Sequence, residues 1–77
     1  MADRPTDVIK ANALIEAAML KAGIISDGRS EKRGSALTSY VAVPNRRHVG
    51  AARTVLENLA GISRVSQNSA GQLVVKW

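Results

Sequence analysis

The hydrophobic pattern of this chain changes its period at Pro44, and that change constrains the fold more than any other feature. Residues 37–43 alternate between two faces, which is typical of a half-buried strand that Pro44 then ends. Apolar side chains recur at helical spacing over residues 45–60, and Asn45 is a favourable N-cap for that helix. A strand must therefore lead directly into a helix at this point of the chain.

The first turn of this predicted helix is basic, because Asn45 is followed by Arg46, Arg47 and His48. The N-terminal end of a helix carries a partial positive charge, so each cation there costs about 0.3 to 1 kcal/mol. A bound phosphate or carboxylate would reverse the sign, because free backbone N–H groups and arginine side chains would converge on it. The pattern thus predicts an anion site, and the alternative is that both arginines extend into water at little cost.

Three further segments complete the predicted secondary structure. Residues 6–22 carry apolar side chains at helical spacing, with Thr6 as the cap and Gly23 as a left-handed stop. Residues 62–77 have a turn cluster between two extended runs and indicate a β-hairpin. The polar segment 26–36 is typical of a solvated basic loop, and the alternative is a flexible arm that becomes ordered on a nucleic-acid backbone.

The predicted order of helix, strand, helix, strand, strand indicates an α+β domain of two layers. Such a chain closes most simply as a three-stranded antiparallel sheet, with the third strand between the first two and both helices on one face. The other face of the sheet would be bare or paired with a partner, and it would carry Thr38, Tyr40, Arg64, Val74 and Lys76. Leu73, Val75 and Trp77 would share the opposite face.

The small core and the open sheet edge predict a homodimer that extends the sheet or stacks helices. Tyr40, on the bare face, and Trp77, at the end of the hairpin, are the candidate interface residues. For Trp77 the alternative role is to cover the edge of the core.

The composition bounds the domain organisation and the cell compartment. The 77 residues make one small domain, 1–77, with little room for a deep cleft. The chain contains no cysteine, which excludes a disulfide framework and a thiolate metal site. Residues 1–5 have no apolar run of signal-peptide length and no segment approaches a membrane span, so we expect a cytoplasmic protein.

The positive charge is concentrated in the second part of the chain. The net charge is +5, and residues 1–28 hold three cations and four acids, whereas residues 29–77 hold eight cations and two acids. Such a segment is the electrostatic footprint of a domain with an anionic partner. One tyrosine and one tryptophan are the only aromatic residues, which does not support a base-stacking platform for single strands.

The chain lacks the residue patterns of an enzyme active site. His48 is the only histidine, so it cannot form a histidine cluster for a metal, and its simplest role is a polar residue in the first helical turn. No nucleophile elbow, P-loop or dinucleotide-binding glycine pattern occurs. We therefore expect a non-enzymatic binding protein without catalytic residues, metal or cofactor.

Three binding functions remain open. The first is nucleic-acid binding through phosphates, by a helix N-terminus and a basic loop. Its candidate residues are Arg46, Arg47, His48, Arg53, Arg29, Lys32 and Arg33. The second is a phage- or plasmid-type accessory protein that docks on an acidic protein surface and inhibits a host factor or a defence protein. The third is a small structural assembly subunit whose bare sheet face makes the contacts.

Overall fold

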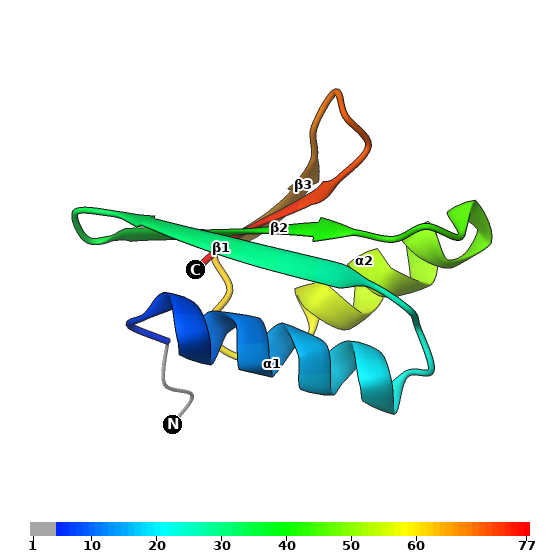
Figure 1. Cartoon of the computed structure of the whole chain (residues 1–77), viewed down its shortest axis with the longest axis horizontal. Helices are drawn as coiled ribbons and strands as arrows, with labels where there is room; N and C mark the ends of the chain where they lie inside the picture. Colours follow the sequence, from blue (N-terminus) through cyan, green and yellow to red (C-terminus); the bar gives the residue numbers. More distant parts are fainter. Residues whose placement is uncertain (1–4) are drawn as a thin grey trace.

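A four-stranded antiparallel sheet lies on two helices in the computed structural model, which describes residues 5–77 (Figure 1). The elements in chain order are α1 (Val8–Lys21), β1 (Asp27–Arg33), β2 (Ala36–Ala42), a 3₁₀ turn η1 (Arg46–His48), α2 (Val49–Glu57), β3 (Arg64–Gln67) and β4 (Leu73–Lys76). The expectation of no signal peptide at residues 1–5 falls mainly on residues 1–4, which lie outside the described residues. Between residues 5 and 77, neither helix has the length and apolar character needed to cross a bilayer.

The prediction of three strands is wrong, because the sheet has four strands in the order β1-β2-β4-β3. The segment 26–36, expected to be a loop or an arm, contains strand β1 and a turn at Gly34, and the element order becomes α-β-β-α-β-β. Periodicity did not reveal β1, because its positions facing the helices are Gly28, Ser30 and Lys32 and form no apolar stripe. The placement of the last strand between its two neighbours is confirmed.

A chain of hydrogen bonds fixes this polar strand to both layers of the fold. The indole N–H of Trp77 donates to Ser39 Oγ at 2.9 Å, and Ser39 Oγ lies 2.6 Å from Ser30 Oγ. Ser30 in turn donates to Asn12 Oδ1 on α1. Because the single hydroxyl proton of Ser30 goes to Asn12, Ser39 is the donor to Ser30. These hydrogen bonds therefore link Trp77, which follows β4, to β2, β1 and α1, and all of them run in the same donor-to-acceptor direction.

Helix α1 begins and ends at residues with specific backbone roles. Its N-cap is Asp7 rather than the predicted Thr6, and the carboxylate accepts a backbone N–H of the first turn at 2.8 Å. At the other end Gly23 has a left-handed φ of 71°, and the next residue, Ile24, is buried with its N–H on the carbonyl of Met19. The predicted stop at Gly23 is thus confirmed.

The second helical segment is shorter than predicted and starts with a tighter turn. Asn45 is the cap, as expected, and its side chain accepts the N–H of Arg47 at 3.0 Å. Residues 46–48 form η1, and α2 begins only at Val49 and ends at Glu57 instead of reaching residue 60. The basic residues therefore occupy a 3₁₀ turn and not the first turn of an α-helix.

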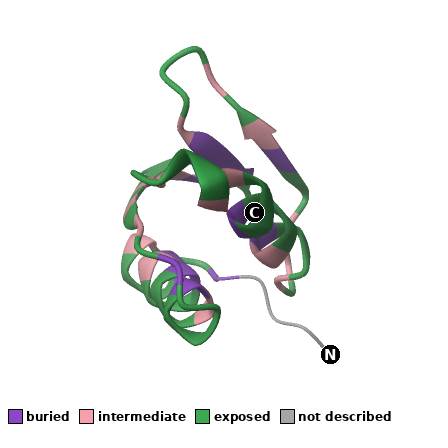
Figure 2. Ribbon diagram, turned by 90° about the vertical axis from the view of Figure 1, so that its right-hand side faces the viewer, coloured by how far each residue is buried: buried purple, intermediate pink, exposed green. Residues whose placement is uncertain are grey.

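The core lies between the helices and the inner face of the sheet, and buried residues come from both layers (Figure 2). The largest fully buried side chains are Ile15, Met19, Leu56, Leu73, Val41, Val75 and Ser39. Trp77 closes this core and is only 7% exposed. The opposite face of the sheet is left uncovered by both helices, as predicted (Figure 1).

Candidate functional site

The uncovered side of the sheet, which we call the outer face, carries its side chains in cross-strand rows. The register places Glu31, Thr38, Lys76 and Arg64 in one row. The next row contains Arg29, Tyr40, Val74 and Ser66. The expected bare-face residues therefore lie on this face, together with the charged residues of β1.

Two cations of the outer face stand directly opposite each other, Arg64 on β3 and Lys76 on β4. Directly opposed side chains have Cβ atoms about 4.5 to 5.5 Å apart, and like charges at this spacing destabilise a sheet. Both residues are exposed, and neither forms an ion pair with a carboxylate of residues 5–77. An anion bound between them would remove the repulsion. Both residues were expected on the bare face, but neither was a predicted site residue, because only the register shows that they are opposed.

The charges of β1 on the outer face largely balance one another. They alternate in sign along the strand: Asp27, Arg29, Glu31 and Arg33. The Glu31 carboxylate lies 4.0 Å from Arg33 Nε and accepts the hydroxyl of Tyr40 at 3.3 Å. The predicted cations Arg29 and Arg33 therefore sit among acids, in contrast to the pair on β3 and β4.

The predicted anion site at the start of the second helix has few free backbone donors. Asn45 accepts the N–H of Arg47 through its side chain and the N–H of His48 through its carbonyl, at 3.0 and 2.9 Å. The N–H of Val49 donates to the carbonyl of Arg46. What η1 offers a partner is thus two exposed guanidinium groups, whereas His48 is half-buried.

Two other predicted contact residues are engaged within the fold. Lys32 lies on the helix side of the sheet, and its Nζ donates to the carbonyl of Thr6 at 2.7 Å. Arg53 lies on α2, where its Nε is 4.0 Å from Glu57 and its Nη2 donates to the carbonyl of Val65 at 3.4 Å. The seven predicted binding residues therefore lie on both faces of β1, on η1 and on α2, and do not form one patch.

The turn of the β3–β4 hairpin brings η1 close to the outer face. Arg46 and Gly71 line one hollow between η1 and this turn. The next residue of the turn, Gln72, lines a second hollow on the outer face together with Arg29 and Tyr40. η1 thus lies beside the end of the sheet that holds Ala42 and Gln72, whereas Lys76 and its partner Arg64 lie nearer the other end, opposite Thr38.

The two predicted interface residues occupy different environments. Tyr40 is half-buried in the middle of the outer face. Trp77 lies on the core side with its ring nitrogen bonded to Ser39, and this position leaves it little surface for a partner. Its neighbours Leu73 and Val75 share that side, as predicted.

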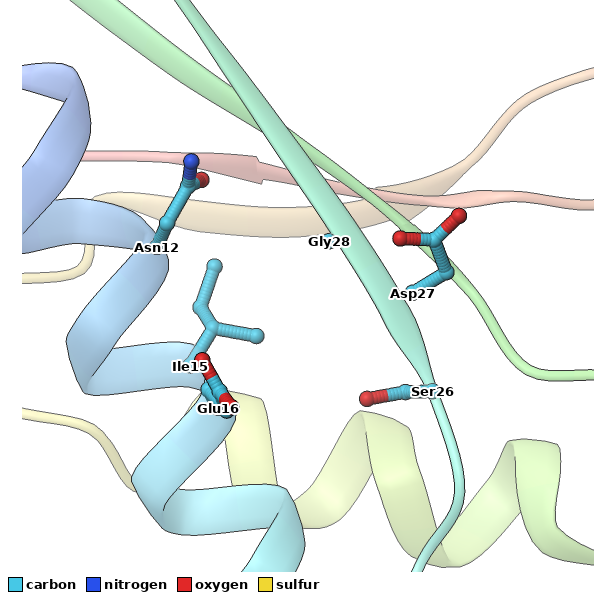
Figure 3. Close-up of a pocket in the computed structure, with 6 residues that line it drawn as sticks. All are labelled: Asn12, Ile15, Glu16, Ser26, Asp27 and Gly28. Atoms are coloured by element: carbon cyan, nitrogen blue, oxygen red, sulfur yellow. The ribbon is translucent and has the colours of Figure 1, made fainter.

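A polar groove of about 230 Å³ runs between α1 and the free edge of β1 (Figure 3). Glu16 lines it from the helix and Asp27 from the strand, and Ile15 lies on the helix between Asn12 and Glu16. Within residues 5–77, no three histidine, cysteine or carboxylate side chains come together as a metal site requires.

The chain matches no protein-family model, no curated protein and no solved structure.

Proposed function

We propose that this chain is a non-enzymatic cytoplasmic protein that binds nucleic acid through its phosphates. The opposed pair Arg64 and Lys76 is the main contact, and Arg46 and Arg47 of η1 make a second contact nearer the other end of the sheet. The observation that carries the proposal is the like-charged pair on an uncovered sheet face, without a carboxylate of residues 5–77 to neutralise it. A bridging phosphate converts this unfavourable arrangement into two charge-assisted contacts.

The distribution of charge over the molecule supports this orientation. The β1 charges on the outer face are two cations and two acids, so the excess there comes from Arg64 and Lys76, joined by the two exposed arginines of η1. The helices, the N-cap Asp7 and Lys32 together contribute four cations and three acids. A polyanion is therefore attracted to the sheet side and to the η1 end.

The chemistry of the outer face favours contact with the phosphate backbone over reading of bases. Tyr40 is the only aromatic residue there, it is half-buried, and its hydroxyl is bonded to Glu31. Single-strand binders that stack bases present several accessible aromatic rings. Affinity should therefore vary little with sequence and fall steeply with salt.

Fluorescence anisotropy with random duplex DNA and with single-stranded DNA and RNA, over a range of salt concentrations, tests the proposal. Four phosphate contacts predict a slope of log K against log salt of about −3.6 on duplex DNA. The double variant Arg64→Gln/Lys76→Gln should flatten the slope by about two units and weaken all sequences alike. Lys10→Gln, an exposed cation on α1, is the matched control and should leave the slope unchanged.

Two results would overturn the proposal. The first is absence of binding to every one of these nucleic acids at about 50 mM salt, where phosphate-led binding is strong. The cations would then be assigned to an acidic protein surface, the partner expected of an accessory protein. The second is an equal loss of slope in the Lys10→Gln control, which would place the contact surface elsewhere.

A further inference from the structure

The two edge strands of the sheet differ in how their outward backbone groups are used. On β3, the carbonyl of Val65 accepts a hydrogen bond from Arg53 on α2.

Which backbone N–H and C=O groups of β1 point away from the sheet follows from the hydrogen bonding of its neighbour β2. The N–H of Trp77 donates to the carbonyl of Leu37, so residues 37, 39 and 41 direct their N–H and C=O groups toward β4.

Backbone direction alternates along a strand, so residues 36, 38, 40 and 42 of β2 direct their groups toward β1. Their partners on β1 are Arg33, Glu31, Arg29 and Asp27, which therefore point inward. The N–H and C=O groups of the intervening residues Gly28, Ser30 and Lys32 point away from the sheet. These are the groups that another strand would use.

We propose that a second copy of this chain docks on the free edge of β1, antiparallel and centred on Ser30, so that the two sheets join into one. In this register Ser30 faces Ser30 of the partner subunit, and Gly28 faces Lys32 of the partner subunit. All three residues with outward backbone groups thus form hydrogen-bonded pairs. The proposal is independent of nucleic-acid binding.

The charges of β1 select this register. Asp27 lies opposite Arg33 of the partner subunit, and Arg29 lies opposite Glu31 of the partner subunit, so every charge on the outer face of the strand meets its opposite. These positions are the non-hydrogen-bonded pairs, where side chains approach most closely. Sliding one strand by two residues in either direction would put arginine opposite arginine and acid opposite acid. Only one antiparallel register therefore pairs all four of these charges with their opposites.

Exposed apolar residues of α1 lie on the same side of the molecule. Asn12 and Glu16 mark the stripe of α1 beside the β1 edge, because Asn12 bonds to Ser30 and Glu16 lines the groove at this edge (Figure 3). Ile9 and Leu20 continue this stripe at helical spacing and are 81% and 78% exposed. In the joined sheet, this stripe lies next to the same stripe of the partner, which shields both side chains from water.

A charge-swap experiment without nucleic acid tests the inference. By sedimentation equilibrium, the wild-type chain should have twice its 8.2 kDa mass at about 100 µM chain concentration. Arg29→Glu places two acids opposite each other, and Glu31→Arg places two arginines opposite each other. Each variant alone should dimerise at least about tenfold more weakly. An equimolar mixture of the two should recover the dimer, because the carboxylate introduced in one chain then faces the guanidinium introduced in the other.

Arg64→Glu makes the same charge change on β3 and is the control that should remain dimeric. Recovery of the dimer in the mixture also shows that both variants are folded. Amide exchange gives a second readout, since the N–H groups of Gly28, Ser30 and Lys32 should be protected in the wild type and lose protection in Arg29→Glu. A monomeric wild type, or a dimer that neither single variant weakens, overturns the inference.

Discussion

Ser39→Ala removes the central member of the hydrogen-bond chain that links Trp77 to α1. Ser39 is completely buried, and its hydroxyl accepts the indole N–H and donates to Ser30. The substitution breaks two hydrogen bonds worth about 1 kcal/mol each, and an unpaired buried N–H adds about 1 to 3 kcal/mol. We expect a loss of about 3 to 5 kcal/mol from a total of about 4 to 11 kcal/mol for a domain of this length.

A double-mutant cycle with Trp77→Phe separates the hydrogen bond from packing. Phenylalanine fills most of the same space but carries no N–H, so Ser39→Ala leaves no orphaned donor in that background. The double variant should therefore be more stable than the sum of the single losses predicts, by about 1 to 2 kcal/mol.

Urea denaturation at one fixed chain concentration is the suitable assay, because dimer formation adds to the apparent stability. With an m-value of about 1 kcal/mol/M, Ser39→Ala should lower the midpoint by about 3 M or more. Ser35→Ala, at an exposed turn residue, is the control and should change it little. A midpoint shift below about 0.5 M for Ser39→Ala, or strict additivity in the cycle, would refute the reasoning.

Two further predictions concern backbone conformation and η1. Gly50→Ala should raise the free energy of unfolding by about 0.5 to 1 kcal/mol, because this exposed helical glycine has open space at its Cβ position. Gly23→Ala should lower the free energy of unfolding by about 1 kcal/mol, because φ is 71° there. Thermal denaturation followed by circular dichroism compares the two variants, and changes of the same sign would contradict this prediction. Arg46→Glu/Arg47→Glu should flatten the salt slope of nucleic-acid binding by about two units and leave the thermal midpoint equal or higher, and an unchanged slope would remove η1 from the proposed contact surface.

Local sequence signals were sufficient for the parts of the fold that depend on periodicity and capping. The stop at Gly23 and the cap at Asn45 depend on residues within one helical turn, so both could be predicted. The alternation of residues 37–43 and the hairpin at 62–77 likewise assigned side chains correctly to the two faces of the sheet. These features need no information from distant parts of the chain.

Strand β1 could not be predicted in this way, because the interactions that hold it are distant in sequence. Its inner positions are glycine, serine and lysine, and no hydrophobic period marks them. Pairing with β2 across the turn at Gly34, and the bonds from Ser30 to Asn12 and Ser39, hold the strand in place. Only the assembled sheet and helix supply these partners.

The sequence by itself determined the two-layer α+β class, the second helix after Pro44 and the basic character of the chain. The tertiary structure decided which cations are free to act. Folding engages Lys32 and Arg53 in internal contacts, and it places Arg64 directly opposite Lys76. The physical reason is that charge and periodicity are properties of single residues and short segments, whereas the opposition of two charges is set by the register between strands.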